Sequence, residues 1–211
     1  IYAIPHTYER PLDCTIGKNR SPFKAVYFAR YAQDKGHEFA FEAFKKVVEK
    51  LPQAEFHCYG TGSRLGELHG LVKKLEMTQH IFLHGWCEDV TEEYESAALS
   101  IISSPSESFS LTIAESLAHG CPVVGFNVPY GPQELIESGV NGYLVEFKET
   151  DAMAERIIQI MKDPSLQREL SENARESSKR FSESTVKDLW VKLFQNICPE
   201  FKFSIQPQVL I

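Results

Sequence analysis

Short apolar runs alternate with amphipathic helical patterns along most of this chain. The runs typical of strands are Phe23–Ala29, Ala54–Tyr59, Ile81–Leu83, Leu99–Ser103, Pro122–Phe126 and Gly142–Val145. Several are almost continuously apolar, which is typical of strands covered on both faces. Helical patterns lie between them, at about 40–51, 65–75, 91–98, 112–119 and 133–138. Such alternation predicts an α/β fold with a doubly wound parallel sheet of about six strands.

The pattern becomes wholly helical after the last predicted strand. Helices are expected at 151–162 and 165–179, separated by Asp163-Pro164, and a third at Glu183–Ile197. We therefore expect one α/β domain over 23–180 and a separate C-terminal helix within 181–198. Residues 1–22 are expected to form a linker, and the tail 199–211 has no recognisable pattern.

Charge and cysteine content exclude several classes of protein. With 22 basic and 29 acidic residues the formal net charge is −7, which argues against a nucleic-acid partner because duplex binding needs a basic face. No apolar run approaches the roughly 20 residues that a membrane-spanning helix needs. The 5 cysteines are scattered and form no C-x-x-C pair, so neither structural zinc nor a disulfide framework is expected. Reduced thiols favour a cytoplasmic location.

Ligands of doubly wound sheets bind beyond the carboxyl ends of the strands, so the loops there are the candidate site. The loop after the first predicted strand places Arg30 and Lys35 just before a helix. Two cations beside a helix N-terminus are suited to a diphosphate, Arg as a bidentate donor and Lys as a point charge. The alternative is a pair of solvated surface cations.

The loop after the second predicted strand contains Gly60 and Gly62. It resembles half of a dinucleotide-binding fingerprint, but the third glycine is absent, since position 65 is leucine. A nicotinamide cofactor is therefore not expected. A tight turn that lets the backbone approach a ligand remains one interpretation, and a purely structural turn is the other.

The loop after the fourth predicted strand carries two glutamates, Glu107 and Glu115, with seven residues between them. Its backbone N–H groups and the following helix dipole would attract an anion. Both glutamates also have a structural interpretation. Thr112 and Glu115 fit a T-x-x-E capping box, and Glu107 could be an exposed loop acid.

Three further polar residues are better explained structurally than catalytically. His84 and His119 have no acidic partner or second ligand at a recognisable spacing, so structural histidines are expected. Cys121, in Gly120-Cys121-Pro122, fits a small buried residue better than a nucleophile. No metal site is predicted.

Several of these motifs occur together and in order, and the set resembles a known family. The E-x7-E loop is followed by Ala-Glu-Ser-Leu-Ala-His-Gly-Cys-Pro-Val-Val, after Arg30…Lys35-Gly36 and before Glu134…Gly139-Val140-Asn141-Gly142. The set resembles the C-terminal donor domain of retaining GT-B glycosyltransferases of family 4, a Rossmann-like half of a two-domain fold. The match runs from about Ala25 to Leu193. It looks most like bacterial α-glycosyltransferases that modify teichoic acids or surface proteins.

The resemblance implies a role for each candidate residue. Arg30 and Lys35 would neutralise the donor diphosphate, Glu107 would bind the donor sugar's hydroxyls, and Glu115 the ribose hydroxyls. Backbone N–H groups would come from Phe109, Ser110 and Leu111, although the family often has glycine where Ser110 stands. The turn at Gly60–Gly62 and the backbone around Trp86 and Cys87 would border the base. No cofactor or metal is implied.

In that family an N-terminal Rossmann-like domain holds the acceptor, and Ile4-Pro5-His6 resembles the linker leading out of it. We therefore expect this chain to be an excised donor domain that binds UDP-glucose or UDP-N-acetylglucosamine weakly and transfers nothing alone. A peripheral membrane association of the full-length enzyme is left open. The alternatives are a sugar-nucleotide epimerase, a catalytically silent partner subunit and a nucleotide-binding regulatory module.

Overall fold

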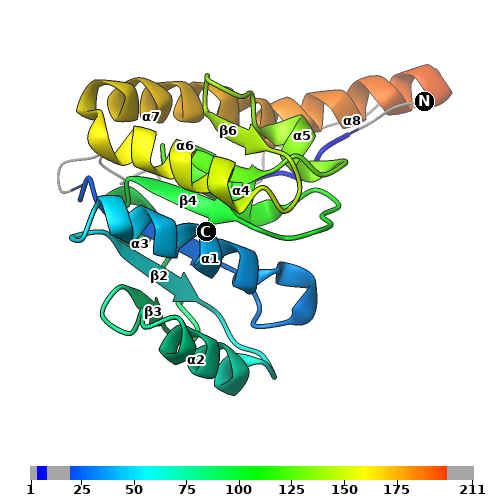
Figure 1. Ribbon diagram of the computed structural model, residues 1–211. Helices are drawn as coiled ribbons and strands as arrows, with labels where there is room; N and C mark the ends of the chain where they lie inside the picture. The colour runs from blue at the N-terminus through cyan, green and yellow to red at the C-terminus, as the bar shows by residue number, and fades with distance from the viewer. Residues whose placement is uncertain (1–3, 9–19, 199–211) are drawn as a thin grey trace.

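A computed structural model describes residues 4–8 and 20–198 of the 211-residue chain. It contains one six-stranded sheet with all strands parallel, in the order β3-β2-β1-β4-β5-β6 (Figure 1). The strands are β1 (Lys24–Phe28), β2 (Glu55–Tyr59), β3 (Ile81–Leu83), β4 (Leu99–Ile102), β5 (Val123–Phe126) and β6 (Gly142–Val145). The predicted doubly wound sheet is confirmed, and β3 and β6 have the predicted bounds.

Helices connect and cover the strands. They are α1 (His37–Lys50), α2 (Leu65–Lys74), α3 (Thr91–Ser96), α4 (Leu111–Ala118), α5 (Gly131–Leu135), α6 (Thr150–Lys162), α7 (Pro164–Ser178) and α8 (Glu183–Ile197). Helix α1 packs beside α2 and α6, and α4 packs beside α5 and α7. Because right-handed crossovers change direction between β1 and β4, these two groups cover opposite faces.

The core explains why the strands are so apolar. All four residues of β4 and of β5 are buried, as are four of the five residues of β1. Helix α1 contributes Phe41, Phe44 and Val47 from one stripe to this core. A strand buried on both faces has no position that faces solvent, so its sequence loses the alternation of a half-exposed strand.

The bounds of most other segments differ from the predicted ones by one to three residues. Helix α5 begins at Gly131 rather than 133, because Pro132 at the start of a helix loses no hydrogen bond that the helix would make. A short 3-10 turn, η1 (Gln33–Lys35), lies in the loop between β1 and α1. Asp163 ends α6 and caps α7, accepting hydrogen bonds from the backbone N–H groups of Ser165 and Leu166.

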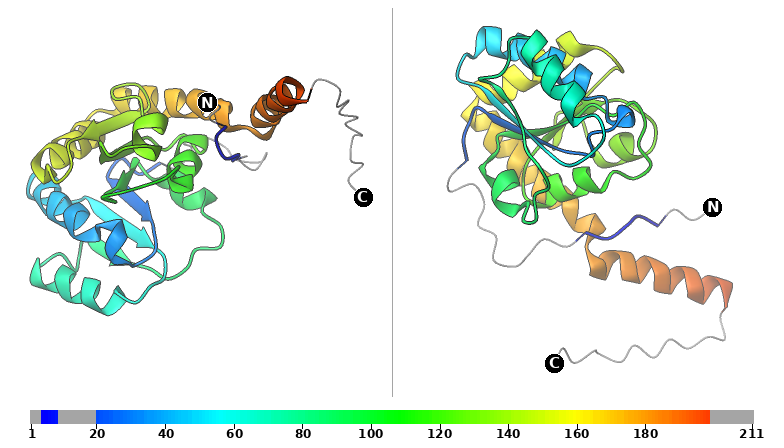
Figure 2. Two further views of the ribbon diagram at one scale, coloured as in Figure 1. Left: turned by 90° about the vertical axis from the view of Figure 1, so that its right-hand side faces the viewer. Right: turned by 90° about the horizontal axis from the view of Figure 1, so that it is seen from below.

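Helix α8 projects from the body of the domain (Figure 2). The 3-10 turn η2 (Lys179–Phe181) separates it from α7, and of its residues only Val186 is buried. Leu189, Trp190, Phe194 and Ile197 leave large apolar side chains exposed, with Trp190 and Phe194 stacked at 5.7 Å between ring centroids. None of the described helices is long and apolar enough to cross a bilayer. The predicted tail 199–211 and Cys14 lie outside the described residues.

Candidate functional site

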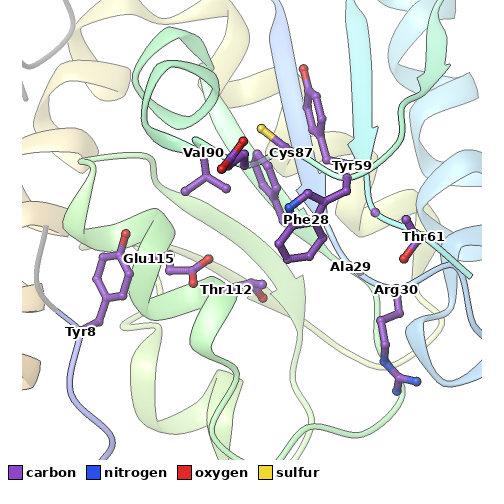
Figure 3. A pocket seen from close by; sticks show the side chains of 13 residues that line it. Tyr8, Phe28, Ala29, Arg30, Tyr59, Thr61, Cys87, Val90, Thr112 and Glu115 are labelled. Carbon is purple, nitrogen blue, oxygen red and sulfur yellow. The ribbon is translucent and has the colours of Figure 1, made fainter. Parts of the chain in front are cut away.

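A cavity of about 470 Å³ lies at the carboxyl ends of β1 and β2, between them and α4 (Figure 3). It is lined by Tyr8, Phe28, Ala29, Arg30, Tyr59, Gly60, Thr61, Trp86, Cys87, Glu88, Val90, Thr112 and Glu115. The position is the one expected for a doubly wound sheet, where β1 and β4 are neighbours and the chain direction of the crossovers reverses. Five of the predicted site residues line it: Arg30, Gly60, Trp86, Cys87 and Glu115.

Aromatic rings form one wall of the cavity. Phe28 and Tyr59 are stacked, with ring centroids 4.8 Å apart, and Tyr94 packs behind Phe28 at 4.5 Å. His84 stacks on the other side of Tyr59 at 4.5 Å, and its Nε2 lies 3.0 Å from Nδ1 of His57. The prediction of a structural His84 is thus confirmed, since it supports this wall through packing and a hydrogen bond.

Glycine 60 brings the ends of β1 and β2 close together. Its backbone N–H donates to the carbonyl of Gly85, and a Cβ placed on it would lie 2.0 Å from the carbonyl oxygen of Ala29. A Cβ placed on Gly62 would lie 2.2 Å from the carbonyl oxygen of Tyr31. Both glycines are therefore required by close backbone contact, and Gly60 also lines the cavity.

Glu115 faces the cavity from one turn inside α4 (Figure 3). The helix begins at Leu111 with Ser110 as its N-cap, so the alternative interpretation of Thr112 and Glu115 as a capping box is wrong. Burial raises the pKa of the Glu115 carboxyl, and a hydrogen bond with the Tyr94 hydroxyl opposes that rise. A half-buried carboxylate directed into a cavity is available to accept hydrogen bonds from a ligand's hydroxyl groups.

Lys35 and Glu107 form an ion pair, with Lys35 Nζ 2.7 Å from Glu107 Oε1. Their side chains are only 20% and 11% exposed. Lys35 is therefore not a solvated surface cation, and Glu107 is not an exposed loop acid. The loop of Lys35 is itself attached to the β4 loop, because the hydroxyls of Tyr27 and Ser103 both donate to the carbonyl of Lys35. The pair does not line the cavity described above.

Arg30 is the exposed cation of the site. Its guanidinium donates to Asp34 at 3.0 Å, and the two side chains are 70% and 57% exposed. An exposed pair of this kind contributes little to stability, so the guanidinium can exchange this partner for a ligand at small cost. Figure 3 shows Arg30 on the side of the cavity opposite Glu115.

Phe109, Ser110 and Leu111 do not line the cavity. Phe109 instead packs between the rings of His6 and Phe181, at 5.4 and 5.5 Å, and Leu111 is exposed at the start of α4. Ser110 has a positive φ of 64°, a left-handed conformation that L-residues other than Gly, Asn and Asp rarely adopt. This conformation explains why glycine is suited to the position.

Replacing Ser110 with glycine should stabilise the fold. Left-handed backbone costs an L-residue about 1–2 kcal/mol, which exceeds the entropy that a glycine loses on folding. The Ser110 hydroxyl makes no capping bond, so little is lost with it. We expect Ser110→Gly to raise the free energy of unfolding by about 0.5 kcal/mol in urea titrations. A decrease would show that the hydroxyl contributes more than the backbone strain costs.

Several residues of the site were missed by the sequence analysis. Phe28 and Tyr59 read as core strand residues, Thr61 as part of a turn, and Tyr8 as part of a linker; only the fold brings them to one cavity. Cys121 is buried with burial raising the pKa of its thiol to about 11, as expected for a packing residue. Within residues 4–8 and 20–198 no cluster of His, Cys, Asp and Glu could hold a metal ion.

Comparisons with known proteins agree with this architecture. Residues 14–177 match the family described as glycosyl transferases group 1. The chain is 31% identical over 190 residues to a poly(glycerol-phosphate) alpha-glucosyltransferase of Bacillus subtilis, covering 90% of this chain and 28% of that protein. It is 28% identical to a poly(ribitol-phosphate) alpha-N-acetylglucosaminyltransferase of Staphylococcus aureus, covering 81% and 35%. The chain thus spans about a third or less of these relatives.

Solved structures give the same result. A variant of Staphylococcus aureus TarM, in complex with fondaparinux, alpha-GlcNAc-glycerol and UDP, superposes with a TM-score of 0.84 at 26% identity, over 92% of this chain and 39% of that one. The pneumococcal O-GlcNAc transferase GtfA, in complex with UDP and GlcNAc, gives 0.78 at 25% identity, over 92% and 38%. With a family match over most of its length and the C-terminal half of a GT-B fold, this chain belongs to the group 1 glycosyltransferases.

Proposed function

We propose that the chain is the donor-binding domain of a retaining glycosyltransferase and that it binds UDP-glucose or UDP-N-acetylglucosamine. The observation that carries the proposal is the cavity at the strand ends, with Arg30 on one side and Glu115 on the other. A cation suits the diphosphate of a nucleotide-sugar and a carboxylate suits ribose hydroxyls. The presence of UDP in the TarM and GtfA complexes supports this choice of nucleotide.

The Lys35–Glu107 pair fits the junction between diphosphate and sugar. In a nucleotide-sugar the distal phosphate and the sugar hydroxyls are adjacent, and here an ammonium and a carboxylate lie 2.7 Å apart. Lys35 would contact the phosphate and Glu107 a sugar hydroxyl, each keeping the other in place. As the glycosidic bond breaks, negative charge grows on the leaving diphosphate, and Lys35 with Arg30 would stabilise it without a metal ion.

We also propose that transfer requires a second domain that holds the acceptor. The relatives are about two to three times as long as this chain, and α8 presents an exposed apolar side that includes Trp190 and Phe194. Large exposed apolar side chains on one helix are typical of a surface that another domain covers. The acceptor domain is therefore the partner expected on α8.

Calorimetric titration of UDP into the chain tests the donor site. We expect saturable binding that is lost in an Arg30→Ala, Lys35→Ala double variant, and no transfer of sugar by the domain alone. Absence of heat at millimolar UDP, or unchanged affinity in the double variant, would contradict the proposal. Comparing UDP-glucose with UDP-N-acetylglucosamine in the same titration then selects the sugar.

Replacing Glu115 with glutamine should raise the stability of the fold and lower its affinity for UDP. Since burial raises the carboxyl pKa in the folded state, the ionised form destabilises the fold at neutral pH. Glu115→Gln should therefore be more stable than the wild type at pH 7.5, with the difference vanishing below the unfolded-state pKa of about 4.3. UDP affinity should nevertheless fall about 10-fold, since hydrogen bonds to a charged acceptor are lost.

Thermal unfolding at pH 7.5 and pH 4, together with UDP titration, checks both parts of this prediction. A variant less stable than the wild type at pH 7.5 would mean that the Tyr94 hydrogen bond outweighs burial. Unchanged UDP affinity would remove Glu115 from the donor site.

A further inference from the structure

The segment that precedes β1 contributes one residue to the cavity. Tyr8 lies more than a hundred residues from Glu115 in the chain, yet the two side chains line the same wall (Figure 3). The sequence gives no sign of this, since Tyr8 belongs to a stretch without strand or helix. Its position is a product of tertiary contacts alone.

Tyr8 is held by its backbone and by its side chain. Its backbone N–H donates to the carbonyl of Phe181 at 2.9 Å, at the turn where the chain leaves the domain for α8. Its hydroxyl is hydrogen-bonded to Nε2 of His119 at 3.0 Å. Two residues earlier, the ring of His6 packs against Phe109, which packs on Phe181. The segment is thus fixed against the domain at three points.

His119 is a rigid support for the Tyr8 hydroxyl. It is fully buried at the end of α4, the helix that carries Glu115, and its ring stacks on Tyr94 at 5.6 Å with an angle of 12° between the planes. The Tyr94 hydroxyl in turn lies 3.2 Å from the carbonyl oxygen of Thr112, another residue of the cavity wall. Tyr8, His119 and Tyr94 therefore connect the preceding segment to the wall around Glu115.

We propose that Tyr8 is a nucleoside-contacting residue of the donor site and that His119 positions it. The inference rests on the proposed function and extends it to the segment before β1. Tyr8 lies beside the carboxylate and across the cavity from Arg30, so it is at the ribose end rather than the phosphate end (Figure 3). An aromatic face packs well on the C–H side of a sugar ring. Because two hydrogen bonds already hold Tyr8, little conformational entropy is lost when a nucleoside binds.

Nuclear magnetic resonance titrations of the whole chain with UDP, uridine and pyrophosphate test this assignment. Tyr8→Ala should weaken UDP and uridine by the same factor, about tenfold, and leave pyrophosphate binding unchanged. Tyr8→Phe keeps the ring and should lose about twofold. The matched control is Tyr143→Ala on β6, at the far edge of the sheet, which should bind UDP like the wild type.

The test of His119 must distinguish its hydrogen bond to Tyr8 from a mere loss of packing. Gln can place a nitrogen or oxygen near the Nε2 position, so His119→Gln should retain UDP affinity while His119→Leu loses about twofold. If His119 acts through the Tyr8 hydroxyl, then adding His119→Leu to Tyr8→Phe should weaken binding no further. Additive losses would overturn the positioning role, and thermal unfolding identifies any variant that fails to fold.

The outcomes separate this inference from the proposed function. If the unaltered chain binds UDP and Tyr8→Ala binds it equally well, Tyr8 is not a donor contact, while the proposed function stands. If Tyr8→Ala weakens pyrophosphate as much as uridine, the residue acts on the phosphate end and the assignment is wrong. Failure of the unaltered chain to bind UDP would overturn both.

Discussion

Replacing Lys35 with alanine is expected to lower the affinity for UDP-sugar by about 100-fold, more than the loss of one exposed cation would cause. The substitution removes the phosphate contact and also leaves Glu107, only 11% exposed, without its 2.7 Å partner. A carboxylate left unpaired near the donor diphosphate repels it. A hydrogen bond between charged groups contributes about 1.5–3 kcal/mol, and the repulsion adds to that loss.

The repulsion can be measured separately. In a Lys35→Ala, Glu107→Gln double variant the unpaired charge is gone, so affinity should recover about tenfold relative to Lys35→Ala alone. Calorimetric titration with UDP-glucose and UDP-N-acetylglucosamine measures both variants. Arg30→Ala is the comparison, because Arg30 is exposed and its partner Asp34 stays in solvent when it is removed. If the double variant binds UDP-sugar more weakly than Lys35→Ala does, the hydrogen bonds of Glu107 to the sugar contribute more to affinity than its repulsion of the diphosphate removes.

Replacing Gly60 with alanine should both destabilise the fold and abolish measurable UDP binding. The added methyl group would lie 2.0 Å from the carbonyl oxygen of Ala29, a backbone atom at the end of β1 that cannot rotate away. The loop that begins at Ala29 must move, and Arg30 moves with it. Strain of this kind between backbone segments costs about 3 kcal/mol or more.

Gly70 provides the matched control. It lies inside α2, and a Cβ at this position meets nothing within 4 Å. Gly70→Ala should therefore raise the free energy of unfolding by about 0.5–1 kcal/mol through helix propensity, with UDP affinity unchanged. Urea unfolding and UDP titration of both variants check the pair. Equal behaviour of the two variants would mean that the turn at Gly60 adapts freely and does not fix the cavity wall.

The fold could be predicted from the sequence because strands buried on both faces consist almost entirely of apolar or small residues. In β4 and β5 every position is buried, so the runs Leu99–Ile102 and Val123–Phe126 are apolar or small throughout. The stripe on α1 is equally direct, since one face packs on the sheet. Helix starts were less accessible: Thr112 and Glu115 satisfy the capping pattern, yet α4 begins at Leu111 because Ser110 adopts the left-handed conformation.

Residue types and loop positions pointed to Arg30 and Glu115 as site candidates, and both line the cavity where strand ends meet loops. Partnerships between loops could not be predicted in this way. Lys35 and Glu107 lie 72 residues apart, and their pairing depends on β1 and β4 being neighbours and on Tyr27 linking the two loops. Hydrophobic periodicity shows which face of a helix or strand is buried, but it does not show which other element packs on that face.

The sequence by itself determined that the sheet is parallel, the order of strands and helices along the chain and the loops that border the cavity, since each follows from local burial and turn chemistry. Tertiary structure decided which of these residues share one cavity. It placed Tyr8 beside Glu115, stacked Phe28 on Tyr59 and joined Lys35 to Glu107. These contacts join residues that are distant in the chain, and their geometry is fixed only when strands and helices pack together.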